Sequence, residues 1–188
     1  MLFRSLTAPD GNIGLYAGKS VMVSERPDGR GLSAQVTLPS GTIDNRGQLI
    51  ADAGTIALHA RVVNQGGSIQ ANTVRNHGGV IELVADDAVN LQAGSTISAK
   101  ADDATSHGGN VRIQAGQQFT DNAASSIDAS GGTSGGDGGR VAISAPQMGS
   151  LFSRIVAAAT GGSRGGELVI DPLDIAINNS GAATPGSG

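Results

Sequence analysis

The feature that most constrains the fold of this chain is a short pattern, Gly-x-aliphatic-x-aliphatic, which recurs along its 188 residues. The pattern begins at Gly11, Gly54, Gly79, Gly109, Gly139 and Gly166. Successive copies are 43, 25, 30, 30 and 27 residues apart, and the first interval is long enough to hold two repeats. Self-similarity at a period of about 20 to 50 residues indicates a solenoid or another repeat architecture.

Two shorter motifs recur between these copies. Asn-x-Gly occurs at Asn45 and Asn64, and Ser/Thr-Ile-x-Ala occurs at Thr96 and Ser126. Each unit alternates apolar and polar residues between Gly, Asn, Asp or Ser, which is typical of a short strand with one buried face. Units of two or three such strands, without a helical heptad, predict an all-β fold. We expect a parallel β-helix (β-solenoid) of about seven to eight coils over residues 11–177.

The alternation also predicts which side chains face inward and outward. Stacking at a strand spacing of about 4.8 Å makes one core ladder of Ile56, Ile81, Val111, Val141 and Leu168. A glycine ahead of each strand fits a corner that needs positive φ or close backbone approach. The six motif glycines are therefore the structural site residues that we predict. On the outer surface, the same register puts Glu82 opposite Arg112 and Arg140 opposite Glu167 on adjacent rungs.

The composition narrows the classes of function. The chain has 30 glycines, only 15% charged residues, and four aromatic residues, so large aromatic anchors cannot dominate a core or a binding face. A net charge of -4, with basic residues spread along the chain, argues against nucleic acid as a partner. The absence of cysteine excludes disulfides and thiolate metal sites. No signal peptide is visible, and no stretch approaches the roughly 20 apolar residues of a membrane span.

Paired acidic residues are the first candidates for chemistry. Asp86-Asp87 and Asp102-Asp103 each follow a strand-like segment, and Asp171 and Asp174 flank a proline. Such carboxylates bind Ca²⁺ or act as an acid and base pair in some β-helix enzymes. Neighbouring residues on a strand point to opposite faces, however, and Asp is an ordinary turn residue. We therefore interpret all three pairs as solvated corners.

The remaining candidates are weaker. The stretch Gly131–Gly139 resembles a calcium-binding nonapeptide, but Ser134 stands where a glycine is needed. The chain has three histidines, His59, His77 and His107; the last two precede equivalent strands and would stack on the rod, but two ligands make a poor metal site. We assign no catalytic residue, no cofactor and no metal ligand, and we expect that the chain is not an enzyme.

A further set of segments is similar to those of a known family. These segments are 7–18, 47–54, 91–99, 126–132 and the Gly-x-Leu-x-Ile-Asp-Pro close at 165–177. Together, over residues 7–177, they resemble the filamentous haemagglutinin-type large exoproteins of Gram-negative bacteria. The resemblance implies a right-handed coil, export by two-partner secretion through an outer-membrane transporter, and an adhesin at the cell surface or secreted from the cell. The amino-terminal secretion domain of that family is not recognisable, so a shaft segment is the expectation.

These observations lead to one expected function and two alternatives. The expected function is a rod-like scaffold for cell adhesion whose partner is a receptor or glycan on a host or neighbouring cell. The first alternative is a polysaccharide-binding or polysaccharide-cleaving β-helix, and the second is a filament subunit that assembles end to end through open strand edges. Residues 1–10 are expected to be a frayed start or the end of a preceding coil, and 178–188 a flexible Gly/Ser/Pro tail. Residues 151–156 also fit a helical spacing.

Overall fold

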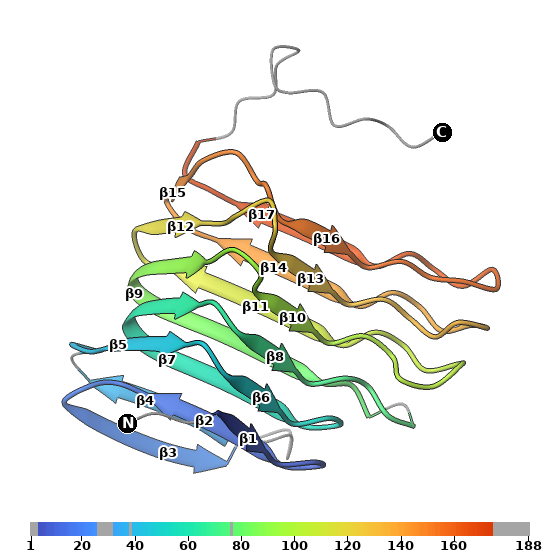
Figure 1. Cartoon of the computed structure of the whole chain (residues 1–188), viewed down its shortest axis with the longest axis horizontal. Helices are drawn as coiled ribbons and strands as arrows, with labels where there is room; N and C mark the ends of the chain where they lie inside the picture. Colours follow the sequence, from blue (N-terminus) through green and yellow to red (C-terminus); the bar gives the residue numbers. More distant parts are fainter. Residues whose placement is uncertain (1–3, 26–31, 38, 76, 175–188) are drawn as a thin grey trace.

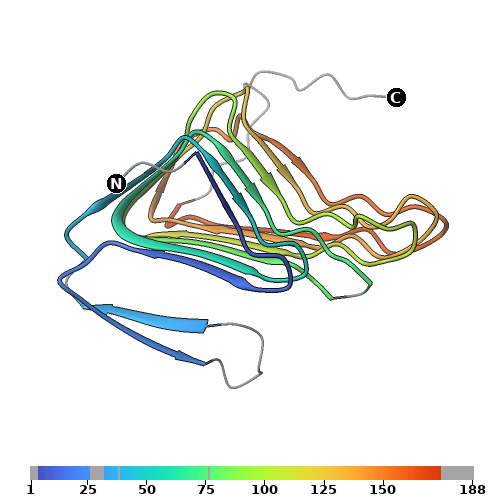
Figure 2. The same ribbon diagram turned by 60° about the horizontal axis from the view of Figure 1, so that its bottom comes forward.

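The chain winds into a parallel β-helix whose rungs are stacked along one axis (Figure 1). The computed structural model describes residues 4–25, 32–37, 39–75 and 77–174, and these contain strands and no helix. Seen from the N-terminal end, the coil has a triangular section with loops projecting from one corner (Figure 2). The predicted fold class, an all-β parallel solenoid, is confirmed.

One side of the triangle is a six-stranded parallel sheet. Its strands, in spatial order, are β1 (Ser5–Thr7), β6 (Gln48–Ile50), β8 (Ser68–Gln70), β10 (Thr96–Ser98), β13 (Ser126–Asp128) and β16 (Arg154–Val156). The middle residues align in one inward column, which is Leu6, Leu49, Ile69, Ile97, Ile127 and Ile155. Residues 154–156 are therefore a strand and not part of a helix, because Ile155 completes this column.

The other two sides belong to one nine-stranded sheet. Its strands are β2 (Asn12–Tyr16), β5 (Thr42–Asn45), β7 (Thr55–Gln65), β9 (Val80–Leu91), β11 (Asn110–Ala115), β12 (Gln118–Thr120), β14 (Arg140–Ser144), β15 (Gln147–Met148) and β17 (Glu167–Asp171). The long strands β7 and β9 bend between the two sides, where their register shifts between Ala60 and Val62. In the later rungs the same bend separates β11 from β12 and β14 from β15.

The predicted core ladder is present in the predicted register. Ile56, Ile81, Val111 and Val141 pair in sequence across adjacent strands and are at most 1% exposed. Leu168 continues the column but is 51% exposed, because β17 pairs with β14 alone. Burial of this column and its neighbours is the main stabilising contribution, since no single rung can bury its own aliphatic side chains.

The number of coils is smaller than predicted. The described residues form six rungs in the six-stranded sheet, against the seven to eight expected. The error lies in the first interval, which was expected to be long enough for two repeats, because Asn12 pairs directly with Thr55 and the motifs at Gly11 and Gly54 are one rung apart. The extra residues form an antiparallel hairpin of β3 (Ser20–Glu25) and β4 (Leu32–Thr37), which leaves the coil near its N-terminal end (Figure 2).

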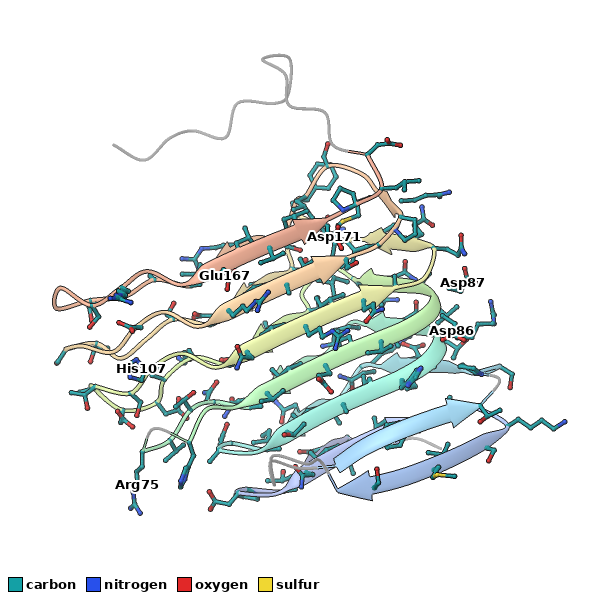
Figure 3. All side chains as sticks on the ribbon, turned by 180° about the vertical axis from the view of Figure 1, so that it is seen from behind. Arg75, Asp86, Asp87, His107, Glu167 and Asp171 are labelled. Carbon is teal, nitrogen blue, oxygen red and sulfur yellow. The ribbon has the colours of Figure 1, made fainter. Side chains whose placement is uncertain are left out.

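The coil is right-handed, as the resemblance implied. Strands of the six-stranded sheet run to the right across the front of Figure 1, and β7, β9, β11, β14 and β17 run to the left behind them. Figure 3, seen from behind, shows these back strands running to the right of the picture, which is the same direction in space. Successive rungs rise toward the C-terminal end, which defines the hand. Part of the segment 1–10 forms β1, and the segment 178–188 lies outside the described residues. No helix among the described residues has the length and hydropathy to cross a membrane.

Candidate functional site

The corner that joins the two sheets is built from an alanine and a glycine. An alanine directly follows each strand of the six-stranded sheet. At five of the six corners the motif glycine donates its N–H to that alanine's carbonyl, at 2.6 Å for Gly109 to Ala99 and 2.7 Å for Gly139 to Ala129, while the N–H of Gly79 is directed at the Thr73 hydroxyl at 3.4 Å. Glycine was expected at this corner either because φ is positive or because the backbone approaches closely, and the structure supports close approach. A Cβ on Gly139 would overlap the carbonyl oxygen of Gly109 in the rung below, and none of the six motif glycines has positive φ.

The residues between that alanine and glycine form loops of very different length. Only residues 52–53 separate Ala51 from Gly54, whereas the later corners contain longer loops, of which the described residues are 72–75 with 77–78, 100–108, 130–138 and 158–165. These four long loops project from the same corner and lie one above another (Figures 1 and 2). They bond to each other through the backbone, for example Ser134 N–H to Ala104 O at 2.8 Å. We call these four loops the loop fin.

Asp103 organises the loop fin. Its carboxylate accepts hydrogen bonds from the Ser106 hydroxyl and backbone, from the Thr105 N–H at 3.0 Å, and from the Arg75 N–H of the neighbouring loop at 2.9 Å. These bonds, led by that from the Ser106 hydroxyl, lower the pKa of Asp103 to about 2. Asp103 is thus a turn residue that ties two loops together, in line with its interpretation as a corner.

Asp102 belongs to a separate polar network at the base of the loop fin. It accepts a hydrogen bond of 2.7 Å from the Asn72 side chain, whose oxygen accepts one of 2.6 Å from the Ser98 hydroxyl. Asp52 accepts from the Asn72 backbone and from the Gln70 side chain. Burial raises the pKa of Asp102, and the Asp52 carboxylate adds to that rise. The network links side chains of three rungs around Asn72, which is 3% exposed.

The first acidic pair lies at the corner of the coil where β9 bends, on the other side of this face from the loop fin (Figure 3). Asp87 pairs with Arg61 of β7 at 2.8 Å, and Asp86 lies 3.7 Å from the Nε2 atom of His59. Each carboxylate therefore faces a basic group of the rung below, and we call these four residues the bend cluster. The contacts join neighbouring rungs at the point where the backbone ladder is interrupted.

The other candidates lie apart from these two groups. His107 accepts a hydrogen bond of 2.8 Å from the Asp137 N–H within the loop fin, and Asp137 accepts one from the Arg164 N–H. His77 lies in an isolated bridge with Val74, Asp171 accepts from the Ser144 hydroxyl at 3.3 Å, and Asp174 is exposed. Among the residues that the structure describes, no three His, Cys, Asp or Glu side chains gather closely enough to hold a metal ion.

The outer face of the nine-stranded sheet keeps the predicted pairs. Arg140 and Glu167 are opposite each other, with 3.3 Å between Nε and Oε2, and Glu82 is opposite Arg112. Both predicted pairs are therefore one rung apart. A shallow groove of about 300 Å³ lies beside them, with Arg112, Gln114, Ser144 and Asp171 among its lining residues.

One hollow of the coil was not predicted from the sequence. A cavity of about 1050 Å³ opens at the N-terminal end of the coil, lined by residues of β1, β2, β5 and the first residues of the next rung. Its lining includes Leu6, Leu15, Ile43 and Leu49. No sequence motif predicts this cavity, because each of these residues occupies an ordinary inward position of its strand.

Comparison with protein-family models, with curated proteins and with solved structures found no match. The fold itself therefore defines the class of this protein, a parallel β-solenoid with one edge of stacked loops.

Proposed function

We propose that the chain is a shaft segment of a secreted or surface-exposed exoprotein of the filamentous haemagglutinin type, which serves as a rod-like scaffold for cell adhesion. The proposal includes export of the full-length protein through an outer-membrane transporter of a Gram-negative bacterium. It rests on the resemblance over residues 7–177 and on a solenoid fold that suits a shaft.

The observation that carries the proposal is the continuity of the columns from rung to rung. Inward columns are aliphatic, and outward positions pair across rungs, as Arg140 does with Glu167 and Arg61 with Asp87. Each added rung lengthens such a structure by about 4.8 Å without a new kind of contact. This arrangement is suited to spanning distance between a cell and what it adheres to.

The loop fin is the part of the rod that we expect to contact another cell surface. The coil repeats one backbone path, whereas the loops differ in length and carry exposed polar side chains, among them Arg75, His107 and Arg164. Loops held on a rigid scaffold commonly carry binding residues. The partner in this proposal is a receptor or glycan that hydrogen-bonds with these side chains.

Adhesion of coated beads to cultured epithelial cells tests the proposal. Beads coated with the chain should bind severalfold more than albumin-coated beads. A matched variant replaces loop 130–138 by Asp-Ala, the two residues that close the corner between Ala51 and Gly54, so the coil should be retained. We expect this variant to bind less than the unaltered chain.

The outcomes separate the alternatives. Binding equal to that of albumin-coated beads would overturn the adhesive function, and full binding by the shortened variant would remove the loop fin as the contact surface. Release of reducing ends from polysaccharides by the chain would favour the enzyme alternative, for which the groove at Arg112 and Asp171 is the place to substitute.

A further inference from the structure

The hairpin β3–β4 is the only element of the described residues that does not belong to the coil. Among these residues β3 pairs with β4 alone, and β4 is the strand that lies beside β2 and β7 of the coil. Figure 2 shows the hairpin outside the triangular section, with β3 on the side away from the coil. Because an isolated two-stranded hairpin is marginally stable in water, this element would gain stability from a further strand on the free edge of β3.

The free edge of β3 has none of the usual features that protect an edge strand. Natural edge strands are blunted by proline, by a β-bulge or by charged side chains. The register between β3 and β4 continues without a shift from Ser20, opposite Thr37, to the last residue of β3. β3 contains no proline, and its one charged residue, Glu25, is at its end. Val21 and Met22 are 37% and 69% exposed. The edge is therefore regular and partly apolar, which suits it to pairing.

The sequence of this edge is complementary to itself in an antiparallel pair. From Lys19 to Glu25 the residues are Lys-Ser-Val-Met-Val-Ser-Glu, which is the same order in both directions except that the two ends carry opposite charges. Two copies centred on Met22 would place Met22 opposite Met22, and Ser20 opposite Ser24. Lys19 of each copy would be opposite Glu25 of the other. Opposite charges and apolar pairs directly across two strands stabilise an antiparallel sheet.

Other registers lose this complementarity. A slip of two residues in one direction would place Glu25 opposite Val21, and a slip in the other direction would place Lys19 opposite Val23. A parallel pair in register would place each charged residue opposite its own copy, and like charges in that position destabilise a pair. The sequence therefore favours one arrangement, an antiparallel pair with a two-fold axis at Met22.

The position of the hairpin allows two molecules to meet in this way. Figures 1 and 2 show the hairpin on the side of the coil opposite the loop fin. A two-fold axis at Met22 therefore passes through the hairpin and not through the coil. The contact does not use the first or the last rung, since a rung added before β1 would stack on β1 and β2 and would leave β3 outside the coil.

We propose that the free edge of β3 is a docking site for β3 of a second copy of this chain. The two hairpins would form one antiparallel sheet with the strand order β4, β3, β3, β4. The contact is isologous, because both copies use the same surface, and it therefore closes at a dimer. β3 has 6 residues, so the contact is smaller than a standard interface of about 1,600 Å², and we expect a weak dimer. The proposal does not rest on the adhesive function proposed above.

Sedimentation velocity of the full chain from about 1 μM to about 1 mM tests the proposal, because this range covers the affinities of small interfaces. The mass should rise from that of a monomer to that of a dimer and no further. Met22→Lys would place two like charges opposite each other at the two-fold axis and should abolish the dimer. Leu173→Lys is the matched control, since Leu173 is 78% exposed and lies outside the hairpin, and it should form the dimer.

Two results of this experiment would overturn the proposal. One is a monomeric mass of the unaltered chain at every concentration, which would leave the edge of β3 to a strand of another protein. The other is a dimer that persists in Met22→Lys, because that dimer would have to use a different surface.

Charge reversal tests the register. Lys19→Glu and Glu25→Lys should each raise the Kd of the dimer about tenfold, because two exposed pairs change from attraction to repulsion. The double variant K19E/E25K restores both pairs and should recover the original Kd. An equimolar mixture of the two single variants should form a heterodimer at lower concentration than either variant forms a dimer alone. A double variant that dimerises as weakly as the single variants would contradict the register.

A single cysteine gives a measurement that does not depend on the affinity of the dimer. The chain has no cysteine of its own, and Met22 and Ser24 are both exposed. Met22→Cys should form a disulfide-linked dimer under mild oxidation, because residue 22 is its own partner and partners on adjacent strands lie within disulfide reach. Ser24→Cys is the control, since its two copies would lie about 13 Å apart along the paired strands. Equal rates of linking in the two variants would overturn the proposed pairing.

Discussion

Gly78 and Gly79 are neighbours in the chain but have different surroundings. A Cβ on Gly79 would overlap the carbonyl oxygen of Ala71 at the corner, whereas a Cβ on Gly78 would meet no atom within 4 Å. Neither residue has positive φ, so the difference between them is one of space alone. Five of the six motif glycines, all except Gly11, leave no room for a Cβ, and the prediction that follows applies equally to Gly166 and its open neighbour Gly165.

Gly79→Ala should destabilise the protein and Gly78→Ala should not. Forcing a methyl group into a packed corner typically costs about 1 to 3 kcal/mol, while an exposed change without contacts stays within about 0.5 kcal/mol. Urea unfolding of the two variants measures the difference. Equal midpoints would mean that the corner can relax and that close approach is not what selects glycine.

Asp102 and Asp103 are adjacent, but their pKa values are displaced in opposite directions. Hydrogen bonds to the carboxylate lower the pKa of Asp103 to about 2, so this group contributes stability above pH of about 4 that is lost as the pH falls toward 2. Burial raises the pKa of Asp102, so its charged form disfavours the folded state at neutral pH, and that cost disappears as the pH falls through the raised pKa.

The pH dependence of Tm should therefore separate two isosteric variants. Asp103→Asn should have a lower Tm than the unaltered chain at pH 7, and the gap should narrow below pH of about 4. Asp102→Asn keeps an acceptor for Asn72 and should melt at the same temperature or higher at pH 7. Thermal scans from pH 2 to pH 7 give both curves, and a gap for Asp103→Asn that widens on acidification would contradict this account.

At the scale of elements, the sequence predicted strands well and their connections less well. The strands that stack in the core carry a strict alternation, and the register of Glu82 with Arg112 followed from it. The hairpin β3–β4 was not predicted from the sequence. Residues 24–31 contain Pro, Asp and Gly, which are typical of a loop, and the interval around them was long enough for two repeats. An isolated two-stranded hairpin carries little periodic signal and depends on what it packs against.

The bend of β7 and β9 is a second element that no local pattern marks. Each strand crosses from one side of the triangle to the next without a glycine, and the ladder slips between Ala60 and Val62. The bend cluster lies at this slip, where Arg61 and Asp87 join the two rungs. The acidic pair Asp86-Asp87 was expected to follow a strand as a solvated corner, whereas it lies inside β9 at the bend. Its partners come from a different rung and could not be named beforehand.

At the scale of the whole molecule, stability should decrease from the middle of the rod toward its ends. In a solenoid each rung contacts only its neighbours, so an inner rung has two interfaces and an end rung has one. The inward residues follow this order, from fully buried Ile81 in β9 to half-exposed Leu168 in β17.

Native-state hydrogen exchange should reproduce that order. Amides of β7 and β9 should be the most protected, and those of β1, β16 and β17 the least, because local opening begins where packing is weakest. Uniform protection along a monomeric rod would show that the solenoid unfolds as one unit.

The sequence by itself determined the class of fold, the inward columns and the corner glycines, because these depend on period and on the size of a side chain at a repeated position. Tertiary structure alone decided the number of rungs, the partners of Asp103 and Asp87, the loop fin and the cavity at the N-terminal end. These features arise where segments about one repeat apart meet, or where the stack stops. A local sequence pattern predicts the period of a repeat, but it does not predict which loops will be neighbours or which rung will be exposed.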